Sequence, residues 1–171
     1  MRMPALLTTL ALALAAQPVR ACDGDAMALF ACEAAGGRKY IELCAPSPLA
    51  ADSGFLVYRF GPIAKDGGRG TVELAYPAAT AGSLRKFFAA TYTHDGVYTQ
   101  SVRFVSGGHS YRVFTASGPK GRLDAGVDVR DLRSGKVTAV ACSEAPRFYI
   151  HDLAGLVPCD PETPVGVACV R

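Results

Sequence analysis

Apolar and polar residues alternate with a period of two along most of this chain. In residues 71–76 and again in 126–130, every second side chain is a large apolar one, and the residues between are mostly polar or small. Successive side chains of a β-strand point to opposite faces, so this alternation predicts strands with one buried face. A dense apolar and aromatic run at 55–60 predicts a strand covered on both faces. We expect further strands over residues 27–33, 39–45, 86–93, 97–105, 110–116 and 136–142.

Pairs of turn-forming residues separate these runs, as the connections of β-hairpins do. They are Gly36-Gly37, Gly67-Gly68, Asp95-Gly96, Gly107-Gly108 and Ser134-Gly135. The pattern predicts an all-β fold, an antiparallel barrel or sandwich of about eight to nine strands. Residues 81–88 could form a helical turn instead of the start of a strand, and residues 151–156 predict a short helical turn near the C-terminus.

The first 21 residues are typical of a secretory signal peptide. Arg2 precedes a short apolar run that reaches Ala16, and Val19-Arg20-Ala21 fits a cleavage site with small flanking residues. Cleavage there would leave residues 22–171 as a single β domain; cleavage after Ala16 is the alternative. A cysteine at position 22 also suggests an acylated lipoprotein, although Arg20 occupies a place where that signal has a small or apolar residue.

Charge excludes one class of partner. The chain has 18 basic and 15 acidic residues. Without the predicted signal peptide, which contains Arg2 and Arg20, 16 basic and 15 acidic residues remain. No basic cluster longer than two residues occurs, so we expect no nucleic-acid partner. No later stretch is apolar enough to span a bilayer as a helix, so we expect no transmembrane segment in the mature chain.

The chain has six cysteines, an even number that favours disulfides in an exported protein. Cys32 and Cys44 flank the predicted hairpin around Gly36-Gly37, which predicts a bridge between them. For the other four, two sets are open. One pairs Cys142 with Cys159 and Cys22 with Cys169. The other pairs Cys22 with Cys142 and Cys159 with Cys169. Neither the cysteines nor the three histidines show zinc-site spacing, so we expect no metal or other cofactor.

No catalytic motif is complete. Gly108-His109-Ser110 resembles the start of an esterase elbow, but Arg112 stands where that motif ends in glycine. His94 and Asp95 precede a glycine and fit a hairpin turn. A hydrolase built on His94, Asp95, His109 and Ser110 is therefore the alternative to a non-enzymatic protein.

An ordered set of short motifs resembles a family of small secreted bacterial proteins to which no activity is assigned. The likeness covers roughly residues 27–160. The motifs are Phe30-Ala-Cys32, Gly36-Gly37, Tyr40, Cys44, Tyr58-Arg-Phe-Gly61, Glu73-Leu-Ala-Tyr-Pro77, Phe104-Val-Ser-Gly-Gly108, Tyr111-Arg-Val-Phe114 and Ala125-Gly-Val127. This resemblance implies an exported β domain and names no function.

A second, more distant resemblance concerns residues 106–111. Ser106, Gly107, Gly108, His109, Ser110 and Tyr111 resemble, in outline, the Ser-Gly-rich loop ending in Tyr with which periplasmic inhibitors of c-type lysozyme enter the enzyme. Here His109 is the nearest substitute for the basic residue that precedes the Tyr in those inhibitors. The resemblance implies that this loop would contact a lysozyme through Ser106 and Tyr111.

From these observations we expect a non-enzymatic exported binding module of the periplasm or cell envelope. Gly-rich loops on a rigid disulfide-linked scaffold suit recognition. The expected partner is an envelope or extracellular protein, with lysozyme inhibition through 106–111 as one alternative and a hydrolase as another.

Overall fold

Two five-stranded antiparallel sheets make up the fold in the computed structural model, which describes residues 22–153 and 155–163. The first sheet has the order β10-β1-β2-β3-β4 and the second β5-β6-β7-β8-β9. The strands of the first sheet are β1 (Met27–Ala34), β2 (Lys39–Ala45), β3 (Val57–Pro62), β4 (Leu74–Tyr76) and β10 (Arg147–Phe148). Those of the second are β5 (Phe88–His94), β6 (Val97–Ser106), β7 (His109–Ser117), β8 (Leu123–Asp131) and β9 (Val137–Ala141).

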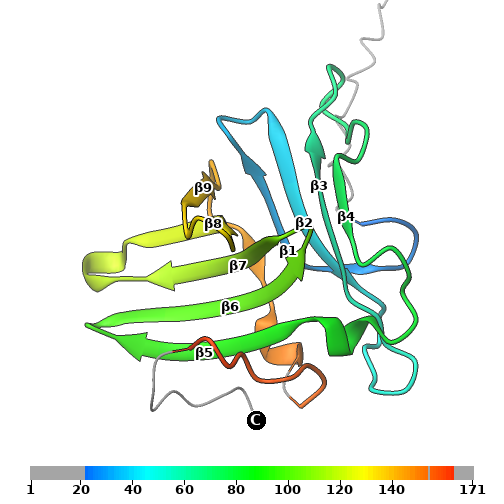
Figure 1. Cartoon of the computed structure of the whole chain (residues 1–171). Helices are drawn as coiled ribbons and strands as arrows, with labels where there is room; N and C mark the ends of the chain where they lie inside the picture. Colours follow the sequence, from blue (N-terminus) through cyan, green and yellow to red (C-terminus); the bar gives the residue numbers. More distant parts are fainter. Residues whose placement is uncertain (1–21, 154, 164–171) are drawn as a thin grey trace, which may run out of the picture.

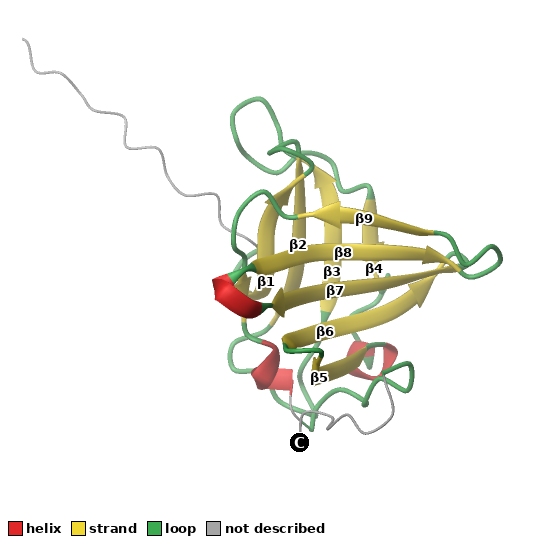
Figure 2. Ribbon diagram, turned by 90° about the vertical axis from the view of Figure 1, so that its left-hand side faces the viewer, coloured by secondary structure: helices red, strands yellow, loops and turns green. Residues whose placement is uncertain are grey.

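The strands of the two sheets cross steeply. In Figure 1 and in the perpendicular view of Figure 2, β5–β8 run across the picture while β1–β3 run upward. This is the arrangement of an orthogonally packed sandwich, in which the inner faces of the two sheets share one core. The all-β antiparallel prediction is confirmed, and the strands form two sheets instead of one continuous barrel.

Strand positions follow the nine predicted runs closely. The described residues contain a tenth strand, β10, which the sequence pattern did not predict. At two residues it is too short to show a period. Three 3-10 turns complete the described part: η1 (Ser83–Lys86), η2 (Pro119–Gly121) and η3 (Ile150–Leu153). The first lies within the predicted helical turn at 81–88, and the third overlaps the one predicted at 151–156. None of these helices could cross a bilayer. The predicted signal peptide lies outside the described residues.

Aromatic side chains from both sheets meet in the core. The Phe104 ring of β6 stacks on Tyr111 of β7 at 4.8 Å between ring centroids, and on Tyr76 of β4 at 4.5 Å. Tyr58 of β3 lies 5.0 Å from the same ring. Because Phe104 is fully buried and joins three rings from two sheets, it links the sheets at their centre.

Burial raises the pKa of the Tyr58 phenol, and the nearby Tyr111 adds to the effect. Above pH 10 an unfolded chain would ionise this group while the folded chain keeps it protonated, so the folded state binds more protons and stability falls as pH rises. Between pH 7 and pH 10.5, the free energy of unfolding of the wild-type chain should therefore fall by about 1 kcal/mol more than that of Tyr58→Phe. Urea denaturation followed by far-UV circular dichroism measures this.

The exposed Tyr98 provides the matched control for this prediction, because Tyr98→Phe removes a phenol that solvent already reaches. Tyr98→Phe should leave the alkaline loss unchanged. An equal effect of both substitutions would contradict a specific role for the buried phenol.

The predicted Cys32–Cys44 bridge is wrong, although the hairpin that suggested it is present. The bridges are Cys22–Cys44 and Cys32–Cys142. Cys32 is opposite Ile41, three residues from Cys44 along β2. Cys44 also lies with Glu42 on the outer face of the sheet, whereas Cys32 packs against the core. Register and side-chain parity therefore separate the two thiols.

The predicted partners of Cys22 and Cys142 are also wrong. Ala34 at the end of β1 forms an isolated bridge with Cys142 just after β9, and this brings Cys142 to Cys32 and joins the two sheets. Cys159 is disulfide-bonded as well, and Cys169 lies outside the described residues. Because the Cys22 sulfur is bonded to Cys44, it is not available to carry the lipid that the lipoprotein alternative requires.

Candidate functional site

A polar depression lies on the outer face of the second sheet, opposite the core. It has a volume of about 300 Å³. We call it the outer basin. Its strand residues are Ser101 and Arg103 of β6, Ser110 and Arg112 of β7, and Asp128 and Arg130 of β8. On each strand the residues between these, such as Val102, Tyr111 and Val129, pack on the core, so the period of two places all six on one face.

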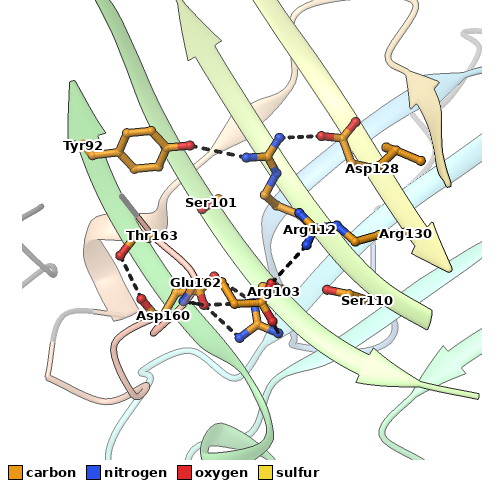
Figure 3. Close-up of a pocket in the computed structure, with 11 residues that line it drawn as sticks. Tyr92, Ser101, Arg103, Ser110, Arg112, Asp128, Arg130, Asp160, Glu162 and Thr163 are labelled. Carbon is orange, nitrogen blue, oxygen red and sulfur yellow. Dashed lines mark hydrogen bonds and ion pairs between the residues drawn. The ribbon is translucent and has the colours of Figure 1, made fainter. Parts of the chain in front are cut away.

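The strand register sets two arginines directly opposite each other. Arg103 of β6 pairs with Arg112 of β7, and Arg112 pairs in turn with Asp128 of β8. Like charges in this position repel, so each guanidinium needs its own carboxylate. Arg112 donates to Asp128 Oδ2 at 2.5 Å and to the Tyr92 hydroxyl at 3.3 Å. This group forms one side of the basin in Figure 3.

The chain after η3 supplies the other side. It runs along β5, where Ala89 donates to the Pro158 carbonyl and accepts from the amide of Asp160. Figure 1 shows this segment in orange and red beside β5. Asp160 accepts from Arg103 Nε at 2.9 Å and from Nη2 at 2.8 Å, and both side chains are about 95% buried. Glu162 lies 3.2 Å from Arg103 Nη1.

Two serine hydroxyls open into the basin between these ion pairs. Ser101 and Ser110 are 2% and 4% exposed, and neither hydroxyl has a hydrogen-bond partner among the described residues. Both hydroxyl oxygens keep some access to solvent, since Thr91 Oγ1 is the only fully buried side-chain polar atom without a partner among the described residues. A molecule that enters the basin can therefore exchange hydrogen bonds with them in place of water. Rigid charged pairs beside unpartnered hydroxyls can therefore bind a small polar molecule.

The predicted site at 106–111 is a hairpin tip whose residues do not share one surface. Gly107 and Gly108 have positive φ values of 57° and 78°, as a type I′ turn requires, and they form the exposed tip between β6 and β7. Ser106 is opposite His109 beside them. Ser110 turns into the outer basin. Tyr111 stacks on Phe104 against the core.

His109 has neighbours of its own at this tip. Its Nε2 lies 3.6 Å from Asp131 Oδ2, and its Nδ1 lies 3.0 Å from the Gly107 carbonyl oxygen. Hydrogen bonds from the amide and hydroxyl of Ser134 lower the pKa of Asp131, with the Arg133 amide and the charge of His109 adding to the effect. These contacts order two adjacent turns at the end of the sheet.

The four residues of the hydrolase alternative are not assembled into one site. His94 Nε2 lies 3.3 Å from Asp95 Oδ2, but both side chains are exposed at the β5–β6 turn. His109 and Ser110 are at the other end of the ten-residue strand β6, about 30 Å away. The side chains of His109 and Ser110 also face opposite sides of the sheet. Ser110 therefore lies far from the His94–Asp95 pair.

A second polar cluster covers the outer face of the first sheet. Glu42 is buried and lies 2.9 Å from Arg69, which also contacts Asp23. Burial raises the pKa of Glu42 in spite of the Arg69 charge, while Arg59 and Arg69 together hold the pKa of Asp23 below its usual range. Glu42 lies near the sulfurs of Cys22 and Cys44, but a disulfide offers no thiolate to a metal.

Sequence analysis missed the outer basin because its residues have the pattern of ordinary solvent-facing strand positions. No family model, curated protein or solved structure is significantly similar to this chain. The case for function therefore depends on the geometry of the site.

Proposed function

We propose that this chain is a non-enzymatic binding module of the periplasm or the extracellular space, and that the outer basin is its recognition site. The observation that carries this proposal is the pair of unpartnered serine hydroxyls between two ion pairs that are already in place. A site formed in advance loses less conformational entropy when it binds. Disulfides and the predicted signal peptide support an oxidising compartment outside the cytoplasm.

Binding without turnover is the favoured activity for a chemical reason. Covalent hydrolysis would need a nucleophile with a general base within hydrogen-bond reach. The basin serines have arginines and carboxylates as neighbours, and no histidine is among the described residues that line the basin. The hydrolase alternative has no such observation in its favour.

Lysozyme inhibition through residues 106–111 stays a prediction. It requires Tyr111 to reach an enzyme, and this ring is half-buried against Phe104. A titration of c-type lysozyme with the purified mature chain decides it, since an inhibitor would abolish activity at a small molar excess.

The proposed site can be tested by recovering what it binds. The mature chain, residues 22–171, is incubated with small molecules from a bacterial envelope extract, washed and denatured, and released compounds are identified by mass spectrometry. We expect one class of small polar molecule, recovered chemically unchanged. Ser110→Tyr should abolish its recovery because the ring would fill the basin.

Ser117 on the same strand is exposed and provides the control substitution. Ser117→Tyr should retain the ligand. Equal recovery from both variants would reject the basin as the site, and recovery of a cleaved product would reject binding without turnover.

A further inference from the structure

The charges that line the outer basin cancel. Three arginines, Arg103, Arg112 and Arg130, face three carboxylates, those of Asp128, Asp160 and Glu162. An anionic ligand would be attracted by the guanidinium groups. It would have no hydrogen-bond donor to offer the carboxylates of Asp128 and Glu162, which would repel it. A cation would meet the opposite problem. A neutral ligand leaves this balance intact.

The groups still free to bind are a mixture of donors and acceptors. Only Oδ2 of Asp128 is bonded, to Arg112, so Oδ1 can accept. Arg130 has one contact, 3.8 Å from Nη1 to Glu162, so most of its N–H groups can donate. The Tyr92 hydroxyl accepts from Arg112 and can donate its own hydrogen onward. Ser101 and Ser110 can do either.

A ligand that satisfies this mixture must offer groups that both donate and accept, at several adjacent positions. Hydroxyl groups have this property, whereas carboxylates and phosphates mainly accept and ammonium groups only donate. Planar guanidinium and carboxylate groups bind two neighbouring hydroxyls at once, as they do in bidentate pairs with each other. The Val137 side chain, 52% exposed, and the Tyr92 ring add apolar surface for the C–H groups of such a molecule.

We infer that the outer basin binds a neutral carbohydrate, a short saccharide whose adjacent hydroxyls bridge the Arg112–Asp128 pair and the two serines. Its volume of about 300 Å³ is at the lower end of the range for small-molecule sites, which limits the bound part to a short unit. This inference rests on the proposed function and specifies its ligand class.

The test uses ¹⁵N-labelled mature chain and measures amide chemical shifts. The neutral probes are maltose, cellobiose and N,N′-diacetylchitobiose, and the anionic probes are glucuronate and inorganic phosphate, all at millimolar concentration. We expect at least one neutral disaccharide to shift amides of β6, β7 and β8 around the basin in a saturable manner. Glucuronate and phosphate should bind more weakly.

Asp128→Asn gives the sharper readout, because it removes an acceptor and leaves the basin with a net positive charge. The dissociation constant of the neutral disaccharide should rise by at least about tenfold, while that of glucuronate should fall. Asp124→Asn is the matched control on the same strand and face. Asp124 pairs with Arg122 outside the basin, so its substitution should change neither constant.

Each outcome decides a different claim. If only glucuronate or phosphate shifts the basin amides, the carbohydrate inference is rejected while the basin remains a binding site. If no probe shifts them, the carbohydrate inference is rejected. The proposed function is then tested separately, by the recovery of a ligand from the envelope extract. An identical response of Asp128→Asn and Asp124→Asn would also overturn the inference.

Discussion

Replacement of both Cys32 and Cys142 by alanine should lower the free energy of unfolding by about 4.8 kcal/mol. The two residues are 110 positions apart, so their bridge removes a large part of the conformational entropy of the unfolded chain. The Cys22–Cys44 bridge spans 22 positions, and the same chain-entropy relation gives about 3.4 kcal/mol for its removal. Both double variants avoid a free thiol, so urea denaturation followed by circular dichroism compares them directly.

The difference between the two variants is the informative quantity. A larger loss for the Cys32–Cys142 pair supports the long closed loop, whereas a larger loss for the Cys22–Cys44 pair would contradict it. The connectivity is checked beforehand on the non-reduced wild-type chain. Trypsin leaves Cys22 and Cys32 in one peptide, so cyanogen bromide cleavage at Met27 is needed to separate them. The fragment before Met27 should then carry the Cys44 peptide.

Strand positions were predictable because they depend on local patterns. The two-residue period, together with the dense apolar run at 55–60, located nine strands, and the turn dipeptides located the hairpins, including Asp95-Gly96 and Gly107-Gly108. These signals work because each strand has a face on the core and each tight turn needs positive φ. The two-residue strand β10 has no such signal, since it forms only where β1 offers a free edge.

The Cys32–Cys44 error could have been avoided from the sequence. With the turn at 35–38, the hairpin register places Cys32 opposite Ile41, and parity places Cys44 on the face of Tyr40 and Glu42. Counting from the turn would therefore have separated the two thiols. The true partner of Cys32 could not have been found this way, because the approach of Cys142 depends on how the two sheets pack.

The outer basin was beyond sequence analysis for the same reason. Arg103, Arg112 and Asp128 each have the pattern of a solvent-facing strand position, and only the ladder across β6, β7 and β8 sets them side by side. Asp160 lies 57 residues after Arg103, in a segment with no two-residue period of its own. Non-local register and a returning segment create the site, and neither leaves a local pattern.

The buried Arg103–Asp160 pair attaches this returning segment to the second sheet, and its contribution to stability can be measured. Asp160→Ala should lower the free energy of unfolding by about 3–5 kcal/mol, because it leaves a guanidinium uncompensated where both side chains are about 95% buried. Glu162→Ala should cost less than about 1 kcal/mol, since Glu162 is 44% exposed and water screens its contact with the same arginine. Urea denaturation measures both losses.

A double variant separates the loss of the pair from the loss of packing. Arg103→Met combined with Asp160→Ala removes both charges, so it should be more stable than Asp160→Ala alone, although one side chain more has been changed. If the single and double variants are equally unstable, the cost comes from the detached segment and not from the unpaired charge. A loss below about 1 kcal/mol for Asp160→Ala would show that the segment does not hold Arg103, and the basin would then lack the wall on which its charge balance depends.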